Sequence, residues 1–262
     1  MNIPKTWDLP SYTIEEFQSK QSTYCIVIPV VNEGKVFTKQ VRMIHERVPY
    51  IDIIIVDGGS TDGSTAASKL RVSGVSALLV KLGNGRLSSQ LRLGYAYALV
   101  RGYTGIITID GNGKDDPRDI QKFIKALDDG YDFVQGSRFI HGGKAINTPF
   151  ERWFAIRAIH APFISAVSGF HFTDTTNGFR GYSRRLLTDT RIQPFRGIFV
   201  TYELLAYLSI RAPKIGLKTI EIPVTRRYPP GKVPTKIDAW GKIHLIWILV
   251  LAVLGMYDPS EK

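Results

Sequence analysis

The sequence predicts an α/β fold in which helices cover both faces of a mostly parallel sheet. Apolar runs rich in β-branched residues alternate four times with helix-like segments between residues 24 and 135, the pattern of successive β-α-β units. The runs are apolar throughout, as expected of strands buried on both faces of a parallel sheet. Most of them end at polar or glycine-rich loops, which fits the edge where such sheets bind ligands.

Strands are predicted in the first half of the chain at residues 24–31, 51–56, 75–82, 105–109 and 132–135. Helices are predicted between them, ending near Val48 and Val72 and then covering 87–101 and 117–127. After Ser137 the alternation breaks down. An amphipathic helix, a polar loop, a second helix, a strand and a basic loop are predicted there, at residues 150–167, 174–180, 200–211, 217–224 and 226–232.

One polar loop, residues 108–117, is expected to organise the fold. Asp110 directly follows an apolar strand, Gly111 and Gly113 permit unusual backbone angles, and Asp115 precedes the next helix. Carboxylates this close repel one another unless a cation lies among them, and Mg²⁺ or Mn²⁺ favours oxygen ligands. A solvated turn whose acids only cap the helix is the alternative interpretation.

Other loop ends also carry acids or amides, namely Glu33, Asp57 and Asn112. At one edge of a sheet they indicate a site for a hydroxyl-rich or cation-bound ligand, although Asp57 also suits helix capping. The first loop lacks the Gly-x-Gly-x-x-Gly pattern of dinucleotide sites, and no Gly-Lys is followed by Ser or Thr as in a P-loop. Nicotinamide enzymes and P-loop ATPases are therefore poor candidates.

The formal charge of +11 is concentrated in the second half of the chain. Residues 1–137 contain 16 Lys and Arg against 15 Asp and Glu, whereas residues 138–244 contain 17 against 6. Such a field favours an anionic partner, such as a phosphate compound or an acidic membrane surface, although a merely soluble basic surface is the plainer interpretation. No nucleic-acid reader motif is present, so nucleic acid is not an expected partner.

Three segments are expected: an N-terminal extension at 1–22, one domain at 23–242 and an apolar tail at 243–262. The single cysteine, Cys25, lies in an apolar run, and no signal peptide is visible, so we expect a reducing, cytoplasmic location. Residues 243–257 are too few for the roughly 20 that span a bilayer. We expect a helix that lies in the membrane interface or docks on the domain. For the helix at 150–167, core packing is slightly favoured over membrane contact.

Five motifs support a resemblance to a known family. They lie at residues 28–33, 56–63, 108–117, 136–139 and 177–180. In this order they resemble the family 2 glycosyltransferases of GT-A fold, and within them the dolichyl-phosphate mannosyltransferase-like branch, over about residues 24–242. The resemblance implies a Rossmann-like GT-A domain whose donor half ends near residue 137 and whose acceptor half follows.

The resemblance also implies roles for individual residues. Contacts to a nucleotide sugar are expected from Pro29, Glu33, Asp57, Lys81, Asp110, Gly111 and Asn112. Contacts to an acceptor phosphate are expected from Ser137, Arg138, Arg180, Arg227 and Lys232. A divalent cation, Mg²⁺ or Mn²⁺, would be held by Asp110, Asn112 and Asp115. The candidate catalytic residues are Asp110, Arg138 and Arg180, with Asp174 added because its residue type suits a base.

Three departures from the family pattern bear on the site. Asn112 stands where the family usually has a second aspartate, and its amide oxygen adds no charge to a metal site. Lys114 stands where a glutamine ligand is often found, and it cannot be a ligand while protonated. It could instead neutralise a diphosphate, with Asp115 or Asp116 supplying the missing charge. Gly58 follows Asp57 where a second aspartate is common. A divalent cation is therefore expected with reduced affinity.

The implied reaction is an inverting transfer of a hexose from a nucleotide diphosphate sugar to a polyprenyl phosphate, dolichyl or undecaprenyl, by an enzyme bound peripherally to a membrane. The acceptor oxygen is already anionic, so basic residues that stabilise the leaving diphosphate matter more than a general base. A hydroxyl acceptor would need a base, for which Asp174 and Glu203 are candidates. Two alternatives stay open: transfer to a hydroxyl of a growing polysaccharide, and a nucleotide-sugar-binding module without turnover.

Overall fold

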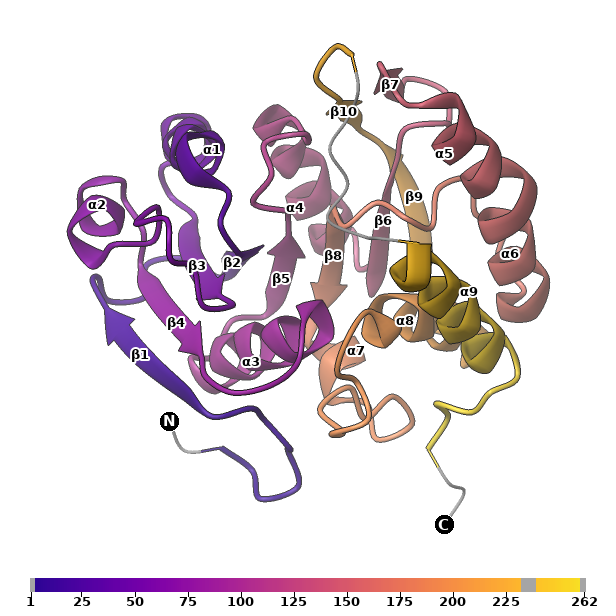
Figure 1. The fold of residues 1–262 in the computed structure, drawn as a ribbon. Helices are drawn as coiled ribbons and strands as arrows, with labels where there is room; N and C mark the ends of the chain where they lie inside the picture. The colour runs from indigo at the N-terminus through magenta and orange to yellow at the C-terminus, as the bar shows by residue number, and fades with distance from the viewer. Residues whose placement is uncertain (1–2, 232–238, 260–262) are drawn as a thin grey trace.

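The computed structural model describes residues 3–231 and 239–259, and a sheet of eight strands forms the centre of that part (Figure 1). The strand order is β1-β4-β3-β2-β5-β8-β6-β9. The strands are β1 (Tyr12–Glu16), β2 (Tyr24–Val30), β3 (Asp52–Asp57), β4 (Ala77–Lys81), β5 (Gly105–Thr108), β6 (Phe133–Ser137), β8 (Arg180–Ser183) and β9 (Thr219–Pro223). The predicted α/β class with a mostly parallel sheet is confirmed.

Helices cover both faces of the sheet because its central strands are apolar on both sides. On one face, α1 (Gly34–Arg47), α2 (Ala67–Val72) and α4 (Ile120–Asp128) share a core with alternate residues of β2 and β3. On the other face, α3 (Leu87–Val100) and α8 (Glu203–Lys214) pack on the remaining residues of these strands. Helix α3 is buried on nearly every side, because it contacts α8 as well as the sheet and because Ser89 and Arg92 bond to the carbonyls of Val200 and Arg196.

Two strands of this eight-stranded sheet were not predicted, and both run antiparallel to their neighbours. Strand β1 pairs with β4 at the edge of the sheet, so the segment 1–22 contributes directly to the fold. Strand β8 lies between β5 and β6, directly after the polar loop at 174–180. The short helix α7 (Arg184–Thr188) follows β8. Through β8 and β9 the second half of the chain joins the same sheet as the first half.

The helix predicted at 150–167 is present as three consecutive pieces, α5 (Phe150–Phe154), the π-helical η2 (Ala155–His160) and α6 (Ala161–Ser168). Only one side of it packs on the core, through Ile156 and Ile164. The large side chains of Trp153, Ile159 and Phe163 are exposed, so the slight preference for core packing was wrong for this side.

The C-terminal helix α9 (Ala239–Val253) contacts α8 and α6 (Figure 1). The segment boundary expected at residue 242 therefore falls inside a helix. Ile248 and Leu249 are buried against the domain, whereas Ile246, Trp247 and Val250 are exposed. The helix docks on the domain, as one of the two expectations had it, and it also presents an apolar outer side.

Candidate functional site

The loop at residues 110–117 is held in place by α1 at the carboxyl ends of β2 and β5. Gln40 donates from Nε2 to the carbonyl of Asp110 at 2.8 Å, and its Oε1 accepts the backbone N–H of Gly113 at 2.9 Å. The N–H of Gly111 donates to the carbonyl of Pro29 at 3.3 Å, and a Cβ on Gly111 would crowd that oxygen at 3.1 Å. Pro29 and Gly111 are thus packed backbone to backbone, and the loop is rigidly placed.

A second segment far along the chain closes over this loop. Strand β10 (Thr225–Arg227) pairs in parallel with β7 (Lys144–Ile146) and also bonds to residues 114–116. Asp116 donates its N–H to the carbonyl of Thr225 at 3.0 Å, and Arg227 donates its N–H to the carbonyl of Lys114 at 2.7 Å. Alternation along β10 turns Arg226 inward and leaves Arg227 exposed.

Arg226 joins the acidic residues of the loop. Its Nη1 donates to Asp115 Oδ2 at 2.5 Å and to Asn177 Oδ1 at 3.1 Å, and its Nη2 lies 3.1 Å from Asp110 Oδ2. Burial acts against the charge of Arg226, but Asp115 and Asp110 raise its pKa overall. Burial also raises the pKa of Asp115 to about 6, although Arg226 opposes this shift. Arg226 and Asp115 thus form a buried ion pair.

The motif at residues 177–180 abuts the same carboxylate. A Cβ on Gly178 would lie 2.3 Å from Asp110 Oδ1, so only glycine allows this approach. The motifs at 28–33 and 177–180 therefore both contact the loop at 108–117, the first at Gly111 and the second at Asp110.

The expected metal ligands are not arranged as a metal centre. Asn112 turns its Nδ2 toward Asp110 Oδ2 at 3.4 Å, and its Oδ1 accepts the N–H of Lys114 at 3.2 Å. Asp115 is buried and paired with Arg226, and its Oδ1 has no hydrogen-bond partner. Over residues 3–231 and 239–259, no three His, Cys, Asp or Glu side chains gather as a metal site. The cation between Asp110 and Asp115 is the Arg226 guanidinium, so this donor set does not fit a divalent ion as it stands.

Tyr228 lies at the centre of a group of cations beside the loop. Its hydroxyl accepts from Arg138 Nη1 at 3.3 Å and from Arg152 Nη1 at 3.1 Å. Lys114 Nζ lies 5.2 Å from the centre of its ring. Burial raises the pKa of Tyr228, but Arg226, Arg138 and Arg152 outweigh it and lower the pKa overall. Burial and then Arg226 lower the pKa of Lys114. These shifts indicate a strongly positive field that would attract phosphate groups.

Arg138 forms a buried, two-pronged ion pair with Asp174. Its Nε and Nη2 lie 2.6 and 2.8 Å from the two carboxylate oxygens, and Nη2 also donates to Thr176 Oγ1 at 3.0 Å. Burial would raise the pKa of Asp174, but Arg138 outweighs it and lowers that pKa. Asp174 is therefore arranged to orient Arg138 rather than to accept a proton.

The remaining acceptor-side candidates are spread over different environments. Arg180 is buried, and its donors reach the carbonyls of Asn177, Leu205 and Thr175 at 2.7 to 2.9 Å, so it holds the loop instead of facing the open site. Ser137 is buried, and its hydroxyl lies 2.5 Å from that of Thr173. Arg227 is exposed beside the loop, and Lys232 lies outside the described residues.

The nucleotide-side candidates lie along the carboxyl edge of β2, β3 and β4. Asp57 Oδ1 accepts the N–H groups of Gly59 and Ser60 at 3.1 and 2.9 Å, and Oδ2 accepts the Thr65 hydroxyl at 2.9 Å. Asp57 therefore orders its own loop. Glu33 stands at the start of α1. Lys81 is buried and donates to the carbonyl of Gly83 at 2.7 Å. Contact of any of these with a nucleotide stays a prediction.

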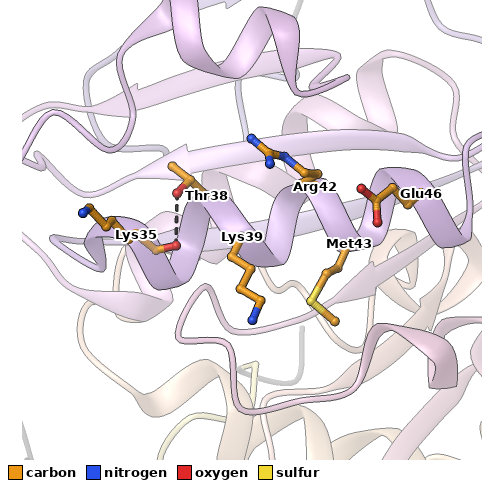
Figure 2. A pocket seen from close by; sticks show the side chains of 6 residues that line it. All are labelled: Lys35, Thr38, Lys39, Arg42, Met43 and Glu46. Carbon is orange, nitrogen blue, oxygen red and sulfur yellow. Dashed lines mark hydrogen bonds between the residues drawn. The ribbon is translucent and has the colours of Figure 1, made fainter.

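A separate hollow lies on the outer side of α1 (Figure 2). It is lined by Lys35, Thr38, Lys39, Arg42, Met43 and Glu46. Its residues all come from one helix, and they do not include any of the residues around Asp110. We therefore assign the site to the loop edge of the sheet and not to this hollow.

Several residues of the site were not anticipated from sequence. Arg226 was recognised only as part of a basic loop, because nothing local distinguishes it from Arg227. If residues 225–227 had been predicted as a strand, the two-residue alternation of strands would have separated Arg226 from Arg227. Gln40 and Tyr228 carry no motif, since each acts through partners 70 or more residues away in sequence.

Solved structures identify the fold. Glucosyl-3-phosphoglycerate synthase from Mycobacterium tuberculosis in complex with UDP aligns with a TM-score of 0.63 at 16% identity, covering 96% of this chain and 88% of that chain. The same enzyme with Mn²⁺, UDP and phosphoglyceric acid gives 0.60 at 16% identity, over 97% and 86%. The fold is thus the GT-A glycosyltransferase fold that the resemblance implied.

The sequence narrows this class to a family. The model of glycosyl transferase family 2 matches residues 25–191, and the chain belongs to this family of glycosyltransferases. It is 28% identical to a polyprenol monophosphomannose synthase of Mycolicibacterium smegmatis, over 76% of each chain. It is 25% identical to an undecaprenyl-phosphate mannosyltransferase of Micrococcus luteus, over 76% of this chain and 81% of that protein. The resemblance to the dolichyl-phosphate mannosyltransferase-like branch is confirmed.

Proposed function

We propose that this protein is an inverting glycosyltransferase that moves a hexose from a nucleotide diphosphate sugar to the phosphate of a polyprenyl lipid. The observation that carries the proposal is the group of Lys114, Arg138, Arg152 and Arg226 around Tyr228, next to Asp110. Two phosphate groups meet in this reaction, and paired guanidinium donors suit both. The polyprenol- and undecaprenyl-phosphate mannosyltransferases among its relatives support the same kind of acceptor.

The state of the candidate bases favours a phosphate acceptor over a sugar hydroxyl. Asp174 is bound by Arg138 through both oxygens. Glu203 accepts the N–H groups of Val200 and Thr201 at 2.9 and 2.6 Å, so it holds the turn that precedes α8. An anionic phosphate oxygen attacks without losing a proton. The main tasks of the chain are then to position the two substrates and to stabilise charge on the leaving diphosphate.

A divalent cation, Mg²⁺ or Mn²⁺, stays a prediction on the donor side. The Mn²⁺ and UDP bound to the fold relative support it, and the arrangement around Asp110 argues that the ion binds weakly here. When bound, such an ion would add positive charge beside the diphosphate. Arg226 and Lys114 already supply positive charge at that place.

We further propose that the enzyme rests on the cytoplasmic side of a membrane through an outer apolar face. This face consists of the exposed large side chains of α5 to α6 and of α9, namely Phe150, Trp153, Phe154, Ile159, Phe163, Ile246, Trp247 and Val250. The contact between helices α6 and α9 supports a single face. Exposed Arg152 and Arg157 flank the aromatic residues, as suits anionic lipid. Within the described ranges, no helix is long and apolar enough to cross a bilayer.

The test of the proposed function is release of nucleoside diphosphate from a panel of GDP- and UDP-sugars, with and without undecaprenyl or dolichyl phosphate. We expect release from one donor that depends on the lipid phosphate. Equal release with soluble oligosaccharides in place of the lipid would favour the polysaccharide alternative. Donor binding without release under every acceptor would favour a binding module without turnover.

A further inference from the structure

The position among the acids of a GT-A loop must be filled by positive charge, because unscreened carboxylates in a half-buried site destabilise each other. In this protein the positive charge is part of the chain. We propose that the Arg226 guanidinium is the resident cation of the site and that it competes with a divalent ion for Asp110. The inference rests on the proposed function only in calling the loop a donor site.

The first support is that Arg226 is fixed by the backbone on both sides. The N–H of Asp116 and the N–H of Arg227 bond to the carbonyls of Thr225 and Lys114, so β10 cannot shift without breaking the closure of the loop. Thr225 is held in addition by Asp119, whose Oδ2 accepts its N–H at 2.7 Å. The backbone on both sides of Arg226 is therefore fixed to the loop, and its side chain is held inside the site.

The second support is the number of acceptors that Arg226 satisfies. It contacts Asp115, Asp110 and Asn177 through two nitrogens, and only 5% of its surface is exposed. A buried guanidinium with two carboxylate partners is held much more strongly than an exposed ion pair. An incoming divalent ion must displace this interaction before it gains Asp110 Oδ2.

The third support comes from the two departures in the loop. Asn112 directs its amide nitrogen at Asp110 and gives its oxygen to the N–H of Lys114, so it does not offer an oxygen beside the carboxylate. Lys114 adds a second positive charge within the loop. Relative to an Asp-x-Asp loop, Asn112 removes one negative charge and Lys114 adds one positive charge. Arg226 then balances the negative charge of the acids that remain. The three features together replace metal charge with side-chain charge.

The inference is tested by Mn²⁺ binding in the absence of nucleotide, followed by electron paramagnetic resonance of the free ion. We expect weak binding to the wild-type protein and at least tenfold tighter binding to Arg226→Ala, equivalent to about 1.4 kcal/mol. This variant removes both the charge and the volume, so that Asp110 and Asp115 face a space open to an ion. Arg226→Lys should fall between the two, because one ammonium cannot bridge both carboxylates.

The matched control is Arg227→Ala, which removes the neighbouring exposed arginine and should leave Mn²⁺ affinity unchanged. Folding of each variant is checked by circular dichroism and thermal unfolding. A folded Arg226→Ala that binds Mn²⁺ no better than wild type overturns the inference. If that variant does not fold, Arg226→Lys decides, and affinity equal to wild type overturns it. Failure of sugar transfer with every donor and lipid would refute the proposed function and leave this binding result standing.

Discussion

Burial determines the role of Asp174 through its ion pair with Arg138. Both side chains are almost completely enclosed, with exposed fractions of 1% and 0%. A carboxylate in that position serves by fixing the guanidinium, because its own lone pairs are occupied. Arg138 still directs Nη1 at Tyr228, so the pair connects the interior to the cation group of the site.

Replacing Asp174 with Asn should therefore damage stability before it affects chemistry. The change leaves Arg138 buried without its counter-charge, which typically costs 3–5 kcal/mol. We expect a loss of about that size in the free energy of unfolding, measured by urea denaturation. The control is Asp189→Asn, which breaks the more exposed pair with Arg191 and should cost less than about 1 kcal/mol. A fully stable D174N variant that had lost only turnover would instead identify Asp174 as a base.

His160 gives a prediction for acid stability. Its Nδ1 lies 2.6 Å from the Thr175 hydroxyl, and burial followed by Arg180 lowers its pKa from 6.5 to about 4. Between pH 6.5 and pH 4, His160 is protonated in the unfolded chain but neutral in the folded chain. The contribution of neutral His160 to the free energy of unfolding is therefore lost as the pH drops from 6.5 to 4. The shift corresponds to roughly 3 kcal/mol.

The measurement for His160 is the free energy of unfolding between pH 7 and pH 4 for wild type and His160→Asn. The wild type should lose roughly 3 kcal/mol more than the variant over this range. Parallel curves for wild type and His160→Asn would contradict the assignment.

Among the elements, α5 to α6 and α9 share an unusual exposure of aromatic and aliphatic side chains. An apolar surface formed by several adjoining helices is uncommon on a protein that stays in water. Trp153 and Trp247, one from each group, are exposed by 41% and 57%. Their rings suit the polar–apolar boundary of a bilayer.

We expect Trp153→Ser and Trp247→Ser each to weaken binding to vesicles that contain anionic lipid, and the double variant to weaken it further. The measurement is co-sedimentation with liposomes at fixed protein concentration. Val72→Ser is the control, since Val72 is highly exposed on the distant helix α2 and should not matter. Equal sedimentation of all variants would indicate that another surface, or none, contacts lipid.

The elements also show how far the sequence could be interpreted. The strands β2 to β6 and the helices between them were predicted because continuous apolar runs alternate with helix-like segments along this part of the chain. Strand β8 was taken for a loop, since Arg180 opens it and its partners β5 and β6 lie far away in sequence. Strand β1 was missed because Tyr12–Glu16 alternates polar and apolar residues over only five positions. Pairing partners that are distant in sequence leave no local signal.

The same limit applied to the site. Asp110 and its loop were identified from a strand that ends in acids and glycines, and their position at the sheet edge agrees. The ion-pair partner of each side chain could not be predicted from the sequence. These partners, such as Asp115 for Arg226 and Asp174 for Arg138, are brought together only by the fold. The motif order identified the family, whereas the electrostatic pairing within the site required the fold.

For the whole molecule, the N-terminal segment is an integral part and not an appendage. Strand β1 covers the edge of β4 over five residue pairs. Trp7 stacks on Phe195 with ring centres 4.0 Å apart, and Leu9 and Ile14 pack against the core. The segment thus bridges the start of the chain to residues of the second half.

Deletion of residues 1–22 should lower the free energy of unfolding by several kcal/mol and promote aggregation, because it removes this apolar packing and exposes the edge of β4. Urea denaturation and light scattering measure the two effects. Deletion of residues 1–5 is the control and should cost less than about 1 kcal/mol, because it leaves Trp7 and β1 in place. If the protein without residues 1–22 is stable and monomeric, the prediction is wrong and the segment is only an extension of the domain.

The closure of the 110–117 loop by β10 has a consequence for how the protein is made. Synthesis proceeds from the N-terminus, and a domain folds as its chain emerges. A nascent chain that stops before Thr225 can form β2 to β5, yet its Asp110 and Asp115 have no guanidinium between them and residues 114–116 lack their backbone partners. The loop at 110–117 therefore closes only after residues 225–227 have been synthesised, and a chain truncated before them carries the acids of this loop without their guanidinium partner.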